Sequence, residues 1–532
     1  MDPLTMVSTR TTPQTEAADS RQVENSAGGY VFQIDDMARL RRFLTLGTTG
    51  GTYYVSEQKL TKDNADVVLN LARTRGLEVV AEVVTISTAG RAPKNNPALF
   101  ALAAVAGLGD DDARKAALAA LKEVARTATH LFIFAGYVEQ FRGWGRGLRK
   151  AIGSWYADTD IDDLAYQAVK YQNREGWSHR DLLRLAHPKG SPEHQALYEW
   201  ICRSTVNDAL PPVVFSHLAA HTPGADIPAL VRESRLSWEM LPSESLTNPE
   251  VWRALIDNGV PMTALIRQLP RLTNLGILNP LAKDNRLTRV VEQLTDSGRL
   301  VKARVHPMTL LVALRTYASG MSARGSGTWQ PIAQVADALD AAFYAAFGAV
   351  EPSGKNTMLA LDVSGSMGSA VAGLPLTCRE ATAALALITA ATEPSHVIVG
   401  FTGSGYLDRN TQITTLPISA RQRLDDVTRS ISNLPFGGTD CSLPMLAALE
   451  TNLAVETFVV LTDNETCAGR MHPHQALTQY RQKTGINAKL AVVAMTPTNF
   501  SIADPTDSGM LDVSGFDTAT PGLISAFSRG DI

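Results

Sequence analysis

The chain of 532 residues has few cysteines and none of the short motifs that mark common enzyme classes. Its four cysteines show no C-x-x-C spacing, which favours reduced thiols. They are Cys202, Cys378, Cys441 and Cys467. No G-x-S-x-G, Walker A or H-E-x-x-H motif occurs, and no carboxylates cluster as two-metal nuclease chemistry requires. These absences favour a binding protein over an enzyme.

Long apolar runs are also missing. The longest, from Ala383 to Ala391, is too short to cross a membrane and predicts a buried helix. No signal-peptide pattern is recognisable, so we expect a cytoplasmic protein without a membrane partner. The composition, 45% hydrophobic and 19% charged, is ordinary for a globular protein, and the length predicts two or three domains.

A strong overall charge is absent too, because the net charge is only −4. The charge is nevertheless uneven along the chain. Residues 351–532 carry 11 Lys and Arg against 17 Asp and Glu, which leaves residues 1–350 slightly basic. The first part is therefore the better candidate for contact with a polyanion.

Apolar residues at i, i+3 and i+4 spacing dominate the region up to about residue 350 and predict helices. The clearest segments are 65–72, 97–106, 111–126, 182–185, 250–265 and 307–317. Short helices in series, with no strands between them, favour an all-α helical-repeat solenoid over residues 25–352. A two-domain helical bundle is the alternative. Residues 1–24 are polar and rich in Ser and Thr, so we expect a disordered tail.

From residue 353 to 532 the pattern changes to alternating strands and helices. Strands are predicted at 357–361, 397–401, 457–461 and 489–494, and helices at 377–391, 420–431, 443–451 and 473–483. This order predicts an α/β domain with a doubly wound, Rossmann-like parallel sheet. A short polar linker, Glu351–Lys355, marks the boundary.

Small oxygen-bearing side chains follow three of the predicted strand ends. The run Asp362-Val363-Ser364-Gly365-Ser366 follows one strand, Gly437-Gly438-Thr439-Asp440 forms a loop, and Thr462-Asp463 ends another strand. Hydroxyls with few carboxylates suit Mg²⁺, which prefers oxygen ligands and keeps an open position. A chance D-x-S-x-S in a surface loop is the alternative.

This pattern resembles the metal-ion-dependent adhesion site of von Willebrand factor A domains. The resemblance implies a divalent cation, with Mg²⁺ expected, as the cofactor. It implies five ligands: Asp362, Ser364, Ser366, Thr439 and Asp463. Such domains bind partners through the cation and do not usually catalyse reactions. A hydrolytic use of the metal is disfavoured because no general base accompanies it.

A basic and aromatic stretch lies between residues 139 and 187. Arg142, Arg146, Arg149 and Lys150 recur at helical spacing, and a second cluster follows them. Its members are Lys170, Arg174, His179, Arg180, Arg184 and His187. Cations on a helix face with aromatics nearby suit a phosphate backbone and stacked bases. The alternative is a solvated face whose arginines pair with Asp158, Asp160, Asp162 and Asp163, with the tryptophans in the core.

The histidines give no metal-site signal. His179 and His187 are eight residues apart and could share a helix face, but no third ligand has a suitable spacing for zinc. His472 and His474 flank Pro473 and are interpreted as a turn and helix start.

The whole chain resembles the SS-A/Ro ribonucleoprotein family, of the bacterial Ro-sixty-related type, whose solenoid is the TROVE module. The resemblance covers roughly residues 21–532 and is carried by spaced segments. Two lie in the A domain, at 437–445 and 461–466; the others are 27–31, 50–54, 143–156, 170–187, 304–307 and 502–505. The first 20 residues and the loop at 158–163 agree least.

The resemblance implies a ring of HEAT-like helical repeats closed by the A domain, and it implies RNA binding. Family members hold a small noncoding Y RNA on the outer basic surface, through residues that match Lys170, Arg174 and His187. They pass single-stranded 3′ ends of misfolded or structured RNA into the ring. Bacterial members use the Y RNA to tether polynucleotide phosphorylase for RNA decay and rRNA maturation under stress. We expect a monomer, since the ring closes within one chain. A Mg²⁺-dependent protein-interaction module without an RNA role is the alternative.

Overall fold

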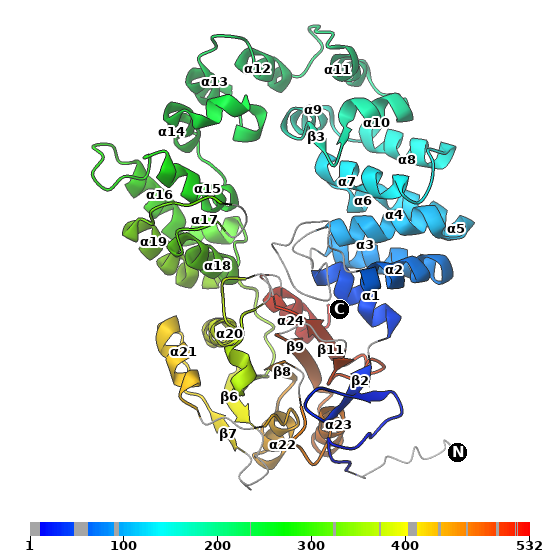
Figure 1. Cartoon of the computed structure of the whole chain (residues 1–532), viewed down its shortest axis with the longest axis vertical. Coiled ribbons are helices and arrows are strands. Elements are labelled where there is room, and N and C mark those ends of the chain that lie inside the picture. The colour runs from blue at the N-terminus through cyan, green and yellow to red at the C-terminus, as the bar shows by residue number, and fades with distance from the viewer. Residues whose placement is uncertain are drawn as a thin grey trace.

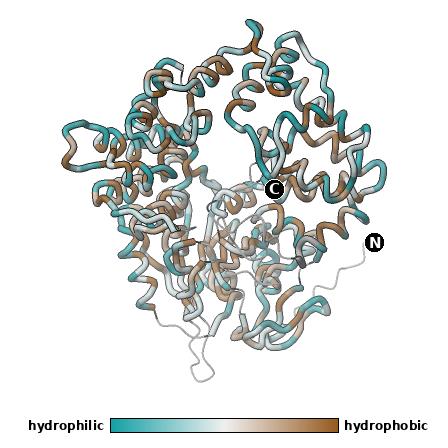
Figure 2. Tube along the Cα trace, turned by 45° about the horizontal axis from the view of Figure 1, so that its top comes forward, coloured by the Kyte–Doolittle hydropathy of each residue, from teal (hydrophilic) through white to brown (hydrophobic). Residues whose placement is uncertain are grey.

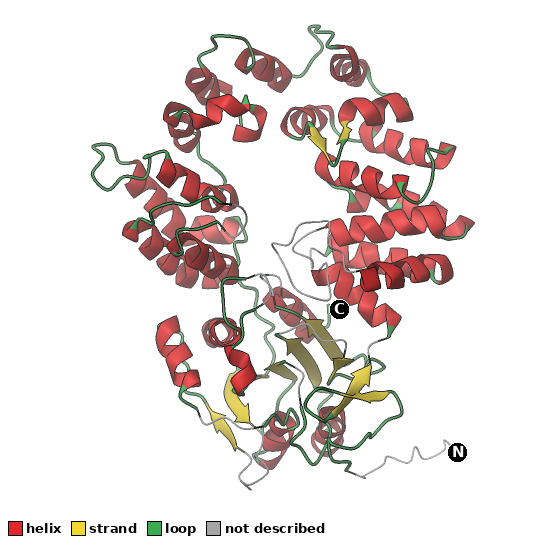
Figure 3. Cartoon of the chain, viewed as in Figure 1, coloured by secondary structure: helices red, strands yellow, loops and turns green. Residues whose placement is uncertain are grey.

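The computed structural model shows a ring of helices whose two ends meet on an α/β domain (Figure 1). The structure describes residues 11–33, 35–46, 62–89, 95–234, 236–322, 326–371, 374–402, 412–434, 438–463, 466–495, 500–516, 518 and 520–531. Strands gather at the α/β end, and among the described residues of the ring a single hairpin, β3–β4, is drawn as strands (Figure 3). The predicted fold class, a helical-repeat ring followed by a doubly wound domain, is confirmed.

Helices α1 to α19 make up the ring. The first half contains α1 Asp36–Leu46, α2 Lys62–Thr74, α3 Gly76–Thr88, α4 Asn96–Leu108, α5 Asp111–Ala119, α6 Leu121–Val124, α7 Ala128–Glu139, α8 Arg146–Ala157, α9 Ile161–Lys170 and α10 His179–Ala186. The second half contains α11 Pro192–Arg203, α12 Pro212–Ala220, α13 Ile227–Ser234, α14 Pro249–Asp257, α15 Met262–Asn274, α16 Arg286–Thr295, α17 Ser297–Lys302, α18 Pro307–Ala318 and α19 Ala333–Ala345. Short 3₁₀ turns η1 to η3 lie at Trp238–Met240, Ser243–Thr247 and Ala346–Ala349.

Three predictions about the ring need correction. The segment 111–126 is two helices, α5 and α6, which are separated at Ala120. The segment 250–265 is two helices, because Gly259 has a positive φ of 87° and Pro261 then starts α15. The ring region also contains a hairpin, β3 Asn173–Arg174 with β4 Trp177–Ser178. Its turn has positive φ at both Glu175 and Gly176, as a tight two-residue hairpin turn requires.

The α/β domain is built on a six-stranded sheet in the order β11-β9-β8-β5-β6-β7. Its strands are β5 Thr357–Asp362, β6 His396–Thr402, β7 Gln412–Thr415, β8 Thr457–Thr462, β9 Lys489–Ala494 and β11 Met510–Ser514. Only β7 runs antiparallel to its neighbour. The helical elements are η4 Gly365–Gly368, α20 Cys378–Thr392, α21 Leu424–Ser432, α22 Leu443–Glu450, α23 Pro473–Thr484 and α24 Thr520–Arg529. The four strands predicted from the sequence are confirmed, whereas β7 and β11 escaped prediction.

The two faces of the sheet pack into different cores. Leu359, Leu361 and Val459 belong to a core that continues into the ring helices. Met358 and Ala360, the alternate residues of β5, belong to a second core on the opposite face, with Tyr480 of α23. This alternation follows from the two-residue period of a strand, and it joins one face of the α/β domain to the ring.

Residues 11–33, which we call the N-terminal strap, do not form the tail that the sequence predicted. Strand β1 Gln22–Glu24 pairs with β2 Tyr30–Gln33, and β2 pairs with β10 Phe500–Ser501 of the α/β domain. The Gln14 side chain is fully buried. The boundary predicted at residue 25 is therefore corrected: the strap packs on the α/β domain, and the ring begins at α1.

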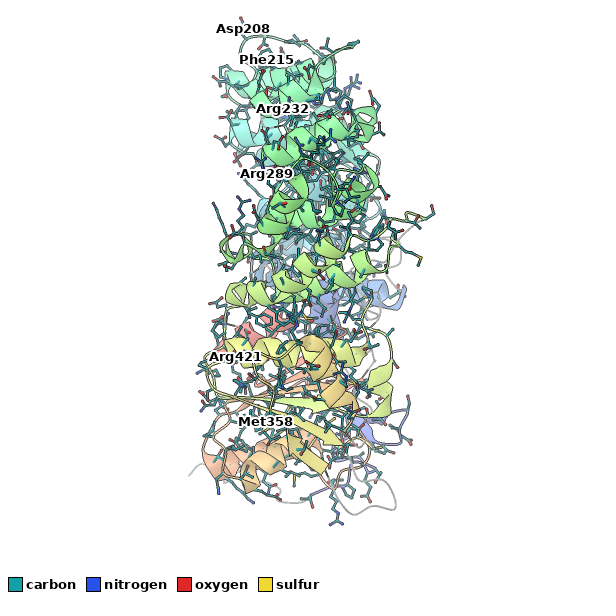
Figure 4. All side chains as sticks on the ribbon, turned by 90° about the vertical axis from the view of Figure 1, so that its left-hand side faces the viewer. Asp208, Phe215, Arg232, Arg289, Met358 and Arg421 are labelled. Carbon is teal, nitrogen blue, oxygen red and sulfur yellow. The ribbon has the colours of Figure 1, made fainter. Side chains whose placement is uncertain are left out.

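Contacts at both ends close the ring, and two views of the chain trace show the same closed path (Figures 1 and 2). At the first end, Arg42 of α1 forms an ion pair with Asp512 of β11. At the other end, Arg315 of α18 lies 3.0 Å from Glu380 of α20. Seen edge-on, the molecule is a narrow slab with Asp208 at the far end of the ring and Met358 in the α/β domain (Figure 4). Within the described ranges, no helix combines the length and the apolar character needed to span a bilayer.

Candidate cation site and nucleic-acid interface

Three of the predicted cation ligands lie at the end of strand β5. Asp362 is the last residue of β5 and is 1% exposed. Its Oδ1 accepts a hydrogen bond from the Ser364 amide (2.9 Å), and its Oδ2 accepts one from the Thr462 hydroxyl (2.8 Å). The Oγ atoms of Ser364 and Ser366 lie 2.9 Å apart. The loop therefore brings one carboxylate and two hydroxyls close together.

Asp463 and Thr439 reach the same edge of the sheet from other segments. Strand β8 pairs in parallel with β5, with Leu461 beside Leu361, so Asp463 follows the strand end next to Asp362. The Thr439 carbonyl accepts hydrogen bonds from the amides of Cys467 (3.0 Å) and Ala468 (3.1 Å), which join the Thr439 loop to the segment after β8. The sequence therefore placed these residues correctly at one sheet edge.

The electrostatics of this edge would favour a cation. Burial, and then the negative charge of Asp463, raises the pKa of Asp362 to about 6. Ser364, Thr439 and Asp463 are each 5% exposed, while Ser366 faces solvent. Adjacent ligands of an octahedral Mg²⁺ with bonds of about 2.0–2.1 Å lie about 2.9 Å apart, which is the separation of the two serine hydroxyls. The donor set thus fits a small hard cation with one side open.

Metal sites of other kinds are not evident. Throughout the ranges that the structure describes, no group of three or more His, Cys, Asp or Glu is placed to hold a metal ion. His472, which the sequence placed at a helix start, is the residue before α23 and accepts a hydrogen bond from Gln22 (3.2 Å). The predicted helix start at His472 is therefore confirmed.

The first basic cluster lies on helix α8. Its apolar side, which includes Leu148, Ile152 and Trp155, is buried. Arg146, Arg149 and Lys150 are exposed, as the helical spacing predicted. Arg142 differs from them, because its Nη1 donates to the Ala106 carbonyl (2.8 Å) and burial lowers its pKa. Arg142 therefore mainly links helix α4 to the loop between α7 and α8.

The second basic cluster is split between three elements. Lys170 ends α9, where its Nζ lies over the rings of Tyr166 and Tyr171 (both 5.3 Å) and 3.9 Å from Glu239. Arg174 is exposed on the β3–β4 hairpin, so the prediction that it shares a helix face with Lys170 is wrong. The hairpin turn interrupts the helical spacing.

The two histidines of this region also differ in their exposure. His179 is 3% exposed, its Nδ1 lies 2.9 Å from the Tyr156 hydroxyl, and burial lowers its pKa to about 4. His187 is an exposed C-cap with a positive φ of 47°. They share no face, and His179 has no surface with which to touch RNA. Its prediction as a contact residue is corrected on this ground.

Helix α10 carries two further exposed cations. A capping box between Ser178 and Asp181 fixes its start. Arg180 and Arg184, one turn apart, are both exposed. In the part of the chain that the structure describes, no ion pair involves either of them or the three cations of α8. The alternative that these arginines are neutralised by the acidic loop at 158–163 is therefore not supported.

Two features of this region escaped the sequence analysis. The first is Arg203 at the end of α11. Burial raises the pKa of the neighbouring Cys202 thiol, and the positive charges of Arg184, Arg180 and Arg203 partly oppose this rise. Trp144 and Trp177 form a tilted pair (5.1 Å) that is half-buried against the core. The position of Arg203 in the last helical turn was the available signal.

Helix α8, the hairpin and α11 all contact α10, so the exposed basic residues of this region lie on adjoining elements. We call these residues together the basic face. It consists of Arg146, Arg149, Lys150, Arg174, Arg180, Arg184, His187 and Arg203.

Comparison with known families covers nearly the whole chain. The TROVE domain matches residues 23–212 and 232–316, and the Ro60 vWA domain matches residues 356–528. The chain belongs to the Ro60 family. A Ro60 relative from Deinococcus radiodurans, named RNA-binding protein RO60, is 43% identical over 534 residues, which span 98% of both chains. A second protein of that name, from Caenorhabditis elegans, is 36% identical and covers 98% of this chain and 92% of its own.

The Ro60 fold is also known from crystallography. The crystal structure of the Deinococcus radiodurans RO (RSR) protein matches with a TM-score of 0.77 at 42% identity. The match covers 94% of this chain and all of that one. The family resemblance drawn from the sequence is thereby confirmed.

Proposed function

We propose that this chain is a non-enzymatic RNA-binding scaffold and that RNA lies on the basic face. The single observation that carries the proposal is the set of exposed cations on the adjoining helices α8 and α10, which have no acidic partners among the described ion pairs. Two relatives of similar length are named RNA-binding proteins, which supports the same function. Unpaired arginines gain affinity from phosphates without sequence preference.

The finer part of the proposal concerns which RNA binds and where. A small structured Y RNA would rest on the basic face, with Lys170, Arg174 and His187 among its contacts. A single-stranded 3′ end of misfolded or structured RNA would enter the ring, whereas a duplex would remain outside. The bound Y RNA would tether polynucleotide phosphorylase and so support RNA decay and rRNA maturation under stress. A cytoplasmic monomer suits this role.

The test is RNA affinity over a salt series for Arg180→Ala/Arg184→Ala. Each lost phosphate contact lowers the log–log salt slope by roughly 0.7–0.9, so the slope should fall by roughly 1.5 and affinity should drop. The control is Arg289→Ala/Arg299→Ala, which removes two arginines that are each more than half exposed but paired with Asp257 and Asp296. Equal effects of the two double variants would reject the basic face.

We also propose that Asp362, Ser364, Ser366, Thr439 and Asp463 hold a divalent cation, with Mg²⁺ preferred. The orientation of one carboxylate and two hydroxyls at the end of β5 supports it. When bound, the ion would offer an open position to an oxygen of a partner. If RNA fails to bind, a Mg²⁺-dependent protein-interaction module remains as the second candidate function, because this geometry would serve it equally.

A further inference from the structure

The N-terminal strap contains one side chain, Gln14, that forms hydrogen bonds with two neighbouring segments of the α/β domain. Gln14 is fully buried. Its Nε2 donates to Asp440 Oδ1 and to the Met471 carbonyl (both 2.8 Å), and its Oε1 accepts from the Thr466 hydroxyl. Its backbone amide donates to the Gly469 carbonyl (2.9 Å), and its carbonyl accepts from the Tyr30 amide (2.7 Å). All of its polar groups are therefore bonded.

The partners of Gln14 enclose the loop that carries the proposed ligand Thr439. Asp440 is the next residue, and its Oδ1 also accepts from the Ser442 amide (3.0 Å) and hydroxyl (2.6 Å). The Thr466 hydroxyl lies 3.2 Å from the Thr439 carbonyl and accepts from the Cys441 amide (3.2 Å). One amide group thus joins the Thr439 loop to the segment that follows Asp463.

Two glycines lie in close contact with this arrangement. A Cβ added at Gly469 would overlap both Gln14 Nε2 and Asp440 Oδ1. A Cβ added at Gly29 would overlap the Thr466 carbonyl, which also accepts from Asn25 Nδ2 (2.9 Å). The strap therefore approaches the segment 466–469 at a distance that only glycine allows, at Gly29 of the strap and at Gly469 of the segment.

We propose that Gln14 is a positioning residue for the cation site, which sets the place of Thr439 through Asp440 and Thr466. The inference rests on the cation proposed above and adds its control by the strap. Because the strap leads into α1, the first ring helix, the cation site and the ring share this segment. The coupling is reciprocal: if the packed strap increases the affinity for the cation, the bound cation must stabilise the packed strap to the same extent.

The first test is Mg²⁺ affinity of the full chain by calorimetry. The variant Gln14→Met keeps the length of the side chain and removes its polar end. Losing these buried bonds should weaken Mg²⁺ binding about five- to tenfold. The matched control is Gln22→Met in the same strap, because Gln22 is buried and bonds His472 and the amides of Ala18 and Asp19, away from Thr439. It should change the affinity less than twofold, roughly the scatter of such measurements.

The second test is hydrogen exchange of the Gln14 and Tyr30 amides, which report on the strap itself. Mg²⁺ should slow both in the natural chain and have no effect in Asp362→Ala. If Gln14→Met does not fold, Thr466→Val removes the bond to Gln14 Oε1 with a similar shape and should weaken Mg²⁺ binding about threefold.

The outcomes separate the two proposals. No Mg²⁺ binding by the natural chain would reject the cation site and this inference together. Binding that is equal in the natural chain, Gln14→Met and Thr466→Val, with strap exchange unaffected by Mg²⁺, would overturn the role of Gln14 alone.

Discussion

At the scale of single residues, burial determines which of the predicted contact residues are accessible to RNA. His179 and Arg180 are neighbours, yet one is buried and the other exposed. The sequence predicted both as contacts because charge and spacing are visible in it, whereas the direction of one residue at a helix start is not. Arg142 shows the same limit, since its bond to the Ala106 carbonyl joins segments far apart in sequence.

Buried histidines should make the stability pH-dependent. Burial lowers the pKa of His130, His179, His306 and His474 to about 4. Below about pH 6.5 the unfolded chain takes up protons that the folded chain refuses, so the free energy of unfolding should fall between pH 6.5 and 4. Urea unfolding at several pH values measures this decrease.

The variant His179→Phe isolates one contribution. It should be less stable at pH 7.5 by about 1–3 kcal/mol, because the buried Tyr156 hydroxyl loses its partner. Its stability should also fall less steeply between pH 6.5 and 4. A pH dependence as steep as that of the natural chain would show that His179 does not stay neutral in the fold.

The cation proposal makes a second residue-scale prediction. Mg²⁺ at 100 times its dissociation constant should raise the free energy of unfolding by about 2.7 kcal/mol, and EDTA should remove the gain. Asp362→Ala should abolish the effect in thermal unfolding. Asp426→Ala, the same change of charge at an exposed α21 residue paired with Arg429, should retain it. Stabilisation that survives in Asp362→Ala would place the cation elsewhere.

At the scale of secondary-structure elements, periodic patterns were reliable and special turns were not. Strands β5, β6, β8 and β9 were predicted almost to the residue, because buried parallel strands are continuous apolar runs. The hairpin β3–β4 and the strap were missed. Each has short strands, and the strap is held by side chains more than 400 residues away in sequence, such as Asp440 from Gln14.

The hairpin gives an element-scale prediction. Gly176 has a φ of 80° and open space around its Cα, so Gly176→Ala should cost about 1 kcal/mol through backbone strain alone. Because Arg174 sits on this hairpin, RNA affinity should fall as well. Gly224→Ala is the matched control, with the same φ and open surroundings in the loop between α12 and α13. The RNA affinity of Gly224→Ala should be unchanged. A loss of affinity equal to that of Gly176→Ala would contradict a role of the hairpin in RNA binding.

At the scale of the whole molecule, the ring depends on contacts that no local pattern reveals. The side chains of Arg42 and Asp512 are only 3% and 15% exposed. At the other end Arg423, which is 57% exposed, pairs with Asp340 and lies 4.3 Å over the Tyr344 ring. The sequence predicted closure only through the family resemblance, because these pairs join residues 83 and 470 positions apart.

The two ends should differ in their energetic weight. Arg42→Ala leaves a carboxylate with little solvent and should cost about 3 kcal/mol or more, whereas the more exposed Arg423→Ala should cost about 1 kcal/mol. Replacing both members of the first pair, as Arg42→Met/Asp512→Leu, should be less damaging than Arg42→Ala alone. Urea unfolding measures the stability of each variant. A double variant that is less stable than Arg42→Ala would contradict this prediction.

The central claim is that this Ro60-family chain sorts RNA by its shape on a basic ring. The most direct measurement is the affinity of the full chain for one structured RNA with and without a single-stranded 3′ tail, across a salt series. The account predicts binding that weakens steeply with salt and is tighter for the tailed RNA. No binding of either RNA at low salt would contradict it and would leave the cation-dependent interaction role in its place.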